Sequence, residues 1–114
     1  MRAVCLVNSF NYERFLSECL DSLVRQHIPF DQVVIVDDGS TDGSRELIES
    51  YCQQHPGWHA VFKQNAGQLS CFNAARPFVR PDDLVTLLDA DDVYPPDYLG
   101  GLLARAQALN ADFY

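Results

Sequence analysis

The 114-residue sequence has no apolar stretch near the roughly 18–20 residues that a membrane span requires. It also lacks a signal-peptide pattern, because Met1, Arg2 and Ala3 lead directly into a predicted strand. We therefore expect a cytoplasmic protein without a membrane span. Basic residues are scarce as well, since 8 Lys and Arg stand against 16 Asp and Glu, for a formal charge of −8. This balance argues against binding to nucleic acid, which is itself a polyanion.

Neither the cysteines nor the glycines form a familiar cofactor motif. The four cysteines are widely spaced, with no CxxC pair and no histidine at zinc spacing, and we interpret them as reduced packing residues. No glycine precedes Gly39, which excludes a glycine-rich dinucleotide fingerprint after the first predicted strand. The composition that remains, 47% hydrophobic and 21% charged, indicates an ordinary globular domain.

Four short apolar runs recur along the chain and predict β-strands, separated by segments with helical periodicity. The predicted strands are residues 3–7, 33–36, 58–62 and 84–88. The predicted helices are residues 13–26, 44–53, 68–79 (weaker, and interrupted by Pro77) and 98–109. Nearly continuous apolar runs are typical of strands covered on both faces of a parallel sheet. The alternation therefore predicts one α/β domain over residues 1–114, with a wound, mostly parallel sheet and flanking helices.

The most informative feature is the acidic run that ends the fourth predicted strand, where Asp89, Asp91 and Asp92 follow the apolar residues 84–88. If the strand continues through Asp91, the carboxylates of Asp89 and Asp91 project to the same side, roughly 6–7 Å apart. Their repulsion, roughly 2–3 kcal/mol, would be relieved by a hard divalent ion, and oxygen-only ligands favour Mg²⁺ or Mn²⁺ over zinc. The alternative is a solvated acidic loop that precedes the next helix.

Polar residues also follow the other predicted strands, where ligands of open α/β sheets bind. Phe10, just after the first strand, offers a face for stacking. Asp37 and Asp38 end the second strand, and one of them must point toward the crevice, where it can accept hydrogen bonds from a base imide or a ribose hydroxyl. Residues 65–70, after the third strand, form an uncharged polar loop that either binds sugar hydroxyls or has no binding role.

Four segments, in order, carry a more specific signal. They are the pair Phe10-Asn11, the stretch VVIVDDGSTDGS at residues 33–44, the series Asn65, Gly67, Ser70 and Asn73, and the stretch LLDADDVYPPDYL at residues 87–99. Together they span nearly the whole chain, which resembles the N-terminal, nucleotide-binding half of a family 2 glycosyltransferase of GT-A fold.

The resemblance implies a nucleotide-diphosphate sugar as donor, with a UDP-sugar favoured, and an acceptor glycan or lipid that the sequence does not identify. Asp38 would read the base, Phe10 would stack on it, and Asp91 would hold the Mg²⁺ or Mn²⁺ that bridges the diphosphate. The residues assigned to the nucleotide sugar are Asn8, Phe10, Asp38, Asn65, Ser70 and Asp89, and those assigned to the metal are Asp91 and Asp89. The first and fourth strands would lie side by side.

The resemblance also implies inverting transfer, which needs a general base for the acceptor hydroxyl. In the family this carboxylate lies downstream of the metal motif, so no catalytic base is expected before Tyr114. Residues 111–114 look like the start of another strand, which predicts a domain cut before its acceptor-binding half. Two alternatives remain: a haloacid dehalogenase-like phosphatase with Asp89 as its nucleophile, and an inactive fragment that self-associates through the unfinished last strand.

Overall fold

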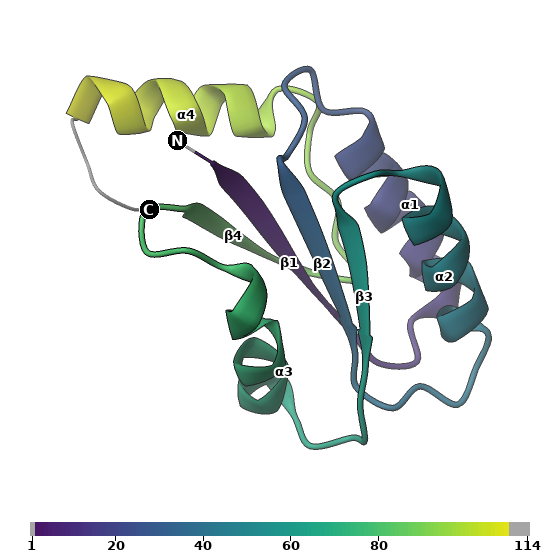
Figure 1. The fold of residues 1–114 in the computed structure, drawn as a ribbon. Helices are drawn as coiled ribbons and strands as arrows, with labels where there is room; N and C mark the ends of the chain where they lie inside the picture. Colours follow the sequence, from purple (N-terminus) through teal and green to yellow (C-terminus); the bar gives the residue numbers. More distant parts are fainter. Residues whose placement is uncertain (1, 110–114) are drawn as a thin grey trace.

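Four parallel strands form the centre of the structure, a computed structural model that describes residues 2–109 (Figure 1). The strands are β1 (Ala3–Ser9), β2 (Gln32–Asp37), β3 (Trp58–Phe62) and β4 (Leu84–Asp89). Their order across the sheet is β3-β2-β1-β4, and every neighbouring pair is parallel. The predicted α/β fold with a parallel sheet is confirmed, as is the adjacency of β1 and β4.

The helices lie on both faces of this sheet (Figure 1). They are α1 (Glu13–Val24), α2 (Ser44–Gln54), α3 (Gln68–Ala75), the short 3₁₀ helix η1 (Arg76–Phe78) and α4 (Tyr98–Leu109). α1 and α2 pack on one face and α3 packs on the other. The segment predicted as a helix over residues 68–79 ends as an α-helix at Ala75, because Pro77 lacks the N–H that the next helical turn requires.

Two hydrophobic clusters account for the continuous apolar runs of the central strands. The larger cluster joins one face of the sheet to α1, α2 and α4, with Leu16, Ile35 and Ile48 fully buried. The smaller cluster joins Val34 and its neighbours to the α3 face. β4 lies at the edge of the sheet, and Leu87 on its α3 side is 56% exposed. The predicted burial on both faces therefore holds for β1 and β2 and only in part for β4.

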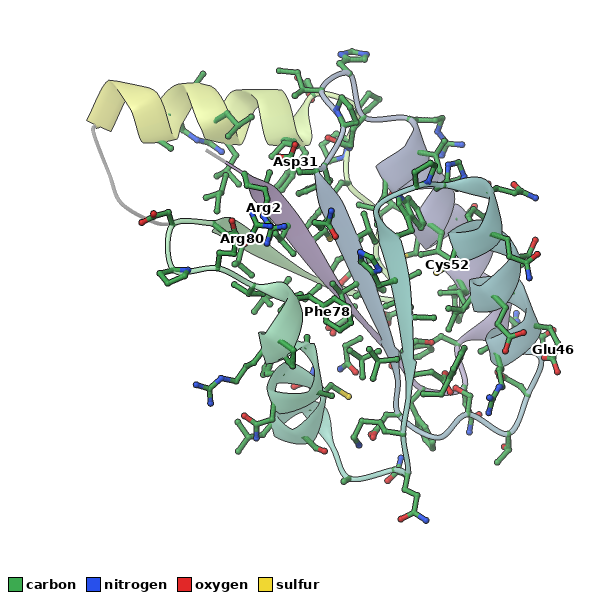
Figure 2. The ribbon with its side chains drawn as sticks, viewed as in Figure 1. Arg2, Asp31, Glu46, Cys52, Phe78 and Arg80 are labelled. Atoms are coloured by element: carbon green, nitrogen blue, oxygen red, sulfur yellow. The ribbon has the colours of Figure 1, made fainter. Side chains whose placement is uncertain are left out.

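Polar contacts also stabilise the amino ends of β1 and β4, at the opposite edge of the sheet from the predicted site residues. Arg2 donates hydrogen bonds from Nη2 to Asp83 Oδ2 (2.7 Å) and to the carbonyl of Phe78 (2.9 Å), and Asp31 Oδ2 accepts one from the Ala3 amide (2.7 Å; Figure 2). The guanidinium of Arg2 holds the pKa of the buried Asp83 carboxyl below its ordinary value, against the opposing effect of burial. The contact between Arg2 and Asp83 joins the segments that lead into β1 and β4.

All four cysteines are free thiols, as predicted from their spacing. Across residues 2–109, each helix is too short or too polar to traverse a bilayer. The strand predicted over residues 111–114 lies outside the described residues.

Candidate donor-binding site

The order of the strands creates a crevice at the carboxyl ends of β1 and β4. The connection from β1 leads to β2 on one side, whereas β4 lies on the other side, so the winding reverses at β1. The register sets Asn8 beside Asp89, and the Ala90 amide donates to the Asn8 carbonyl (3.0 Å). In open α/β sheets, ligands bind at such a reversal.

A cavity of about 310 Å³ lies in this crevice. It is lined by Asn8, Phe10, Tyr12, Asp38, Asn65, Gly67, Gln68 and Asp89. Five of the six residues that the sequence assigned to the nucleotide sugar are therefore in one cavity, although they come from four separate segments of the chain. The sixth, Ser70, is half-buried in the first turn of α3 and is not among the lining residues.

Three lining residues, Tyr12, Gly67 and Gln68, are not among the predicted site residues. Gln68 Nε2 is 3.4 Å from Asp89 Oδ1, a long hydrogen bond that connects the start of α3 to the acidic run. Tyr12 lies edge-to-face against Phe15, with ring centroids 6.4 Å apart. Gln68 stands within the predicted polar loop of residues 65–70, and Tyr12 directly follows the pair Phe10-Asn11. Neither residue type at these positions indicates a ligand.

The turn after β2 separates the two adjacent carboxylates. Asp37 Oδ2 accepts a hydrogen bond from the Ser40 amide (3.0 Å) and Oδ1 accepts one from the Ser40 hydroxyl, so Asp37 stabilises its own turn. Asp38, on the next residue, lines the 310 Å³ cavity. Successive side chains of an extended strand point to opposite sides, and the turn chemistry determines which of the two faces the crevice.

Asp38 is only 4% exposed, and its oxygens already have donors. Oδ1 accepts hydrogen bonds from Lys63 Nζ (2.6 Å) and the Ala66 amide (2.9 Å), and Oδ2 accepts one from the Gly67 amide (3.0 Å). Burial raises the pKa of this carboxyl, but the ammonium of Lys63 and the two amides outweigh that effect and leave the pKa below its ordinary value. Asp38 is therefore a carboxylate at neutral pH.

Phe10 is held at the rim of the cavity by its neighbour Asn11. Asn11 has a φ of 55°, a left-handed conformation that asparagine tolerates better than most residues. Its Oδ1 accepts a hydrogen bond from the Thr41 amide (2.8 Å), and its own amide donates to Ser40 Oγ (2.9 Å). The loops that follow β1 and β2 are thereby joined, and the Phe10 ring, 41% exposed, remains available for stacking.

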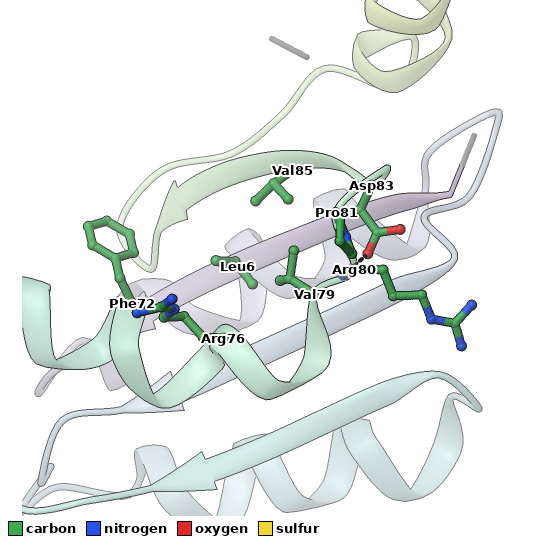
Figure 3. A pocket seen from close by; sticks show the side chains of 8 residues that line it. All are labelled: Leu6, Phe72, Arg76, Val79, Arg80, Pro81, Asp83 and Val85. Atoms are coloured by element: carbon green, nitrogen blue, oxygen red, sulfur yellow. Dashed lines mark hydrogen bonds between the residues drawn. The ribbon is translucent and has the colours of Figure 1, made fainter. Parts of the chain in front are cut away.

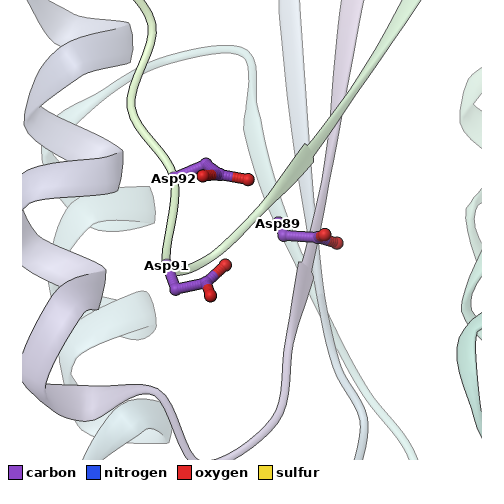
Figure 4. Close-up of side chains that lie close together, drawn as sticks. All are labelled: Asp89, Asp91 and Asp92. Carbon is purple, nitrogen blue, oxygen red and sulfur yellow. The ribbon is translucent and has the colours of Figure 1, made fainter.

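The acidic run forms a cluster at the end of β4 (Figure 4). The strand does not continue through Asp91: β4 ends at Asp89, and the Asp92 amide donates to the Asp89 carbonyl (2.9 Å) in a tight turn. Because the chain reverses there, one carboxylate oxygen from each of Asp89, Asp91 and Asp92 comes within 4.8 Å of the others. All three side chains are exposed.

A second, larger cavity of about 500 Å³ lies between the α3–η1 segment and the edge strand β4 (Figure 3). It is lined by apolar side chains such as Leu6, Phe72 and Val85, together with Arg76 and Arg80. None of the predicted site residues lines it. Of these two cavities, only the smaller one is lined by the polar residues at the strand ends.

Comparison with known proteins identifies the family and the fold. The family description "Glycosyl transferase family 2" matches residues 5–114. An uncharacterised glycosyltransferase of Nostoc sp. is 38% identical over 100 residues, which are 87% of this chain and 31% of that protein. The crystal structure of S. aureus TarS in complex with UDP-GlcNAc has the same fold, with a TM-score of 0.83 and 27% identity over 95% of this chain and 32% of that one. The structure of the Pyrobaculum calidifontis mannosyltransferase PcManGT in complex with GDP-Man and Mn²⁺ also has this fold, with a TM-score of 0.77 and 26% identity over 92% of this chain and 32% of that one.

The chain thus has the GT-A fold of these glycosyltransferases, and its acidic run is compatible with a DXD motif. It belongs to glycosyl transferase family 2. It spans about a third of the length of the relatives named above. The family assignment leaves the phosphatase alternative without support.

Proposed function

We propose that this α/β domain binds a nucleotide-diphosphate sugar, preferably a UDP-sugar, as the donor for inverting glycosyl transfer. The observation that carries the proposal is the 310 Å³ cavity that collects Asn8, Phe10, Asp38, Asn65 and Asp89 at the reversal of the sheet. The complexes of TarS with UDP-GlcNAc and of the mannosyltransferase with GDP-Man support a nucleotide sugar as the class of ligand. The acceptor, a glycan or a lipid, is not specified by these residues.

Each residue has a role that follows from its chemistry. The exposed Phe10 ring would stack on the base, and Asn8, on the floor of the cavity beside Asp89, would orient the nucleoside. Asn65 offers both a donor and an acceptor to ribose or sugar hydroxyls from the opposite wall. Ser70 stands in the first turn of α3, two residues after the lining residue Gln68, and would contribute only if the start of α3 moves toward the donor.

The acidic cluster fits a divalent ion, because its three carboxylates supply only oxygen ligands, with oxygens within 4.8 Å of one another. Asp91 and Asp89 would hold Mg²⁺ or Mn²⁺, and Mn²⁺ accompanies GDP-Man in the mannosyltransferase structure. A bound ion would act as a Lewis acid and a template that neutralises charge on the departing diphosphate. Gln68, which donates to Asp89, would keep that carboxylate oriented toward the cavity.

Hydrogen-bond capacity at Asp38 favours uracil over guanine. A carboxylate offers about four acceptor positions, and three donors already occupy Oδ1 twice and Oδ2 once. The position that remains on Oδ2 suits a single N–H, such as the imide of uracil. Guanine presents two adjacent donors on the corresponding edge, and a paired contact would need both oxygens.

Titration calorimetry tests the proposal directly. UDP is expected to bind in the presence of Mn²⁺ or Mg²⁺ and to bind much more weakly in the presence of a chelator, and GDP is expected to bind more weakly than UDP. Equal affinity for UDP with and without the chelator would reject the metal-bridged arrangement. Equal affinity for UDP and GDP would reject the role given to Asp38.

A further inference from the structure

Lys63 is the only lysine of the chain, and it lies behind the candidate donor cavity. It is not among the residues that line the 310 Å³ cavity; it lines another cavity of about 520 Å³, which shares Asn65 with the first. Its side chain is 17% exposed, and Nζ donates to Asp38 Oδ1 and to the carbonyl of Gln64, at 2.6 Å in each case. Lys63 therefore contacts the cavity wall without reaching the cavity.

Asp38 connects Lys63 to the segment that follows it. The same carboxylate accepts hydrogen bonds from the backbone amides of Ala66 and Gly67. The segment also packs tightly against the turn after β2, since a Cβ at Gly39 would lie 2.8 Å from the amide nitrogen of Asn65. Residues 64–67 are thus held by one buried carboxylate and one close backbone contact.

We propose that Lys63 is a positioning residue for the donor, acting through a latch that consists of Asp38, Lys63 and the amides of Ala66 and Gly67. The latch holds Asn65 and Gly67 in the positions from which they line the donor cavity, and in this respect it rests on the function proposed above. A carboxylate that is 4% exposed needs a counter-charge and several donors. Without the ammonium group, water must enter or the carboxylate must turn outward, and either change releases the two amides.

The test combines a readout that needs no nucleotide with one that does. Amide hydrogen exchange at Ala66 and Gly67 is measured by NMR in Lys63→Met and Lys63→Arg, with the core amides of β1 as reference for the global fold. Arg45→Met is the control, because it removes one positive charge nearby, from a side chain that lies over the Phe62 ring (4.3 Å), without touching Asp38. The dissociation constant of UDP with Mn²⁺ is measured for the same proteins.

In Lys63→Met, exchange at Ala66 and Gly67 is expected to accelerate roughly ten- to hundredfold, the loss expected for a hydrogen bond to a charged group, and UDP affinity is expected to fall about tenfold. Lys63→Arg keeps the charge and should retain most of the amide protection and of the UDP affinity. The Arg45 variant should match the wild type in both measurements. Unchanged exchange in Lys63→Met would overturn the latch, and faster exchange with unchanged UDP affinity would overturn its role in positioning. A wild type that binds no nucleotide would instead refute the proposed function, and the exchange data would still decide the latch.

A measurement on the wild type covers the case in which Lys63→Met does not fold. Because the chain has one lysine, acylation of its ε-amine can be followed by mass spectrometry at a single site. The latch predicts that this amine reacts at least about tenfold more slowly than the amine of N-acetyl-lysine amide, since it is occupied by two acceptors. An equal rate would overturn the latch.

Discussion

Replacing Asp91 by Asn tests whether the acidic cluster binds a divalent cation. The cluster places one oxygen of each of three carboxylates within 4.8 Å of the others, and Asp91 takes part in two of the three pairs. At 4.8 Å, two unit charges repel by about 1 kcal/mol in water and by about 3.5 kcal/mol at an effective dielectric constant of 20. Because all three side chains are exposed, the value in water is the better guide.

Asp91→Asn should therefore stabilise the protein in a chelator. Salt screening and the same repulsion in the unfolded chain reduce the gain to about 1 kcal/mol or less, which corresponds to a rise in Tm of roughly 4 °C for a domain of this size. With Mn²⁺ and UDP the order reverses, and the wild type should be more stable than Asp91→Asn. A ligand at 100 times its Kd stabilises the folded state by about 2.7 kcal/mol, and the wild type should show such a gain with Mn²⁺ and UDP while the variant should not.

Thermal unfolding of both proteins, in chelator and in Mn²⁺ with and without UDP, gives all the required values. Asp82→Asn is the control, since it removes one negative charge from an exposed side chain outside the cluster. A lower Tm for Asp91→Asn in the chelator would refute the electrostatic reasoning. A metal-dependent shift that survives in Asp91→Asn would refute the assignment of Asp91 as a ligand.

Three further predictions concern the walls of the site and the fold beneath it. Phe10→Ala should weaken UDP binding by up to about tenfold, the value of one stacked aromatic, with little change in stability because the ring is 41% exposed; Phe10→Tyr should bind normally in calorimetry. Gly39→Ala should lower the free energy of unfolding in urea by at least about 1 kcal/mol, because φ is +83° and the new Cβ would lie 2.8 Å from the Asn65 amide nitrogen; a neutral effect would contradict that contact. Arg2 lowers the pKa of Asp83 from its ordinary value of 3.8. The stabilisation by this ion pair is therefore present above about pH 4 and is lost as the pH falls through the lowered pKa. Asp83→Asn should be less stable than the wild type at pH 7 and should lose less stability on acidification, as followed by circular dichroism.

The fold could be predicted from the sequence because its determinants are local. Uninterrupted apolar runs in β1 and β2 require cover on both faces, and such cover is characteristic of a parallel sheet with helices on each side. Pro77 marked the weak point of the third helical segment for an equally local reason, its missing N–H. The convergence of Asn8 and Asp89 followed from the strand order that the family resemblance implied.

The details that the sequence did not reveal depend on contacts between distant segments or on a change of chain direction. The separation given for Asp89 and Asp91 assumed an extended strand, whereas a hydrogen bond from the Asp92 amide to the Asp89 carbonyl turns the chain back at this point. The acidic run alone is compatible with either geometry, because aspartate is common both at strand ends and in turns. The turn also brings Asp92 into the cluster, which strand geometry alone did not predict.

For Asp38, the sequence predicts a position facing the crevice but not the hydrogen-bond partners. The sequence indicates that one of two adjacent carboxylates faces the crevice, but the donors that occupy Asp38 lie 25 to 29 residues further along the chain, on the segment after β3. No periodicity relates those positions, and only the parallel pairing of β2 with β3 brings them together. A carboxylate that carries three internal donors can offer one more contact, so the segment from Lys63 to Gly67 sets how much of Asp38 any base can use.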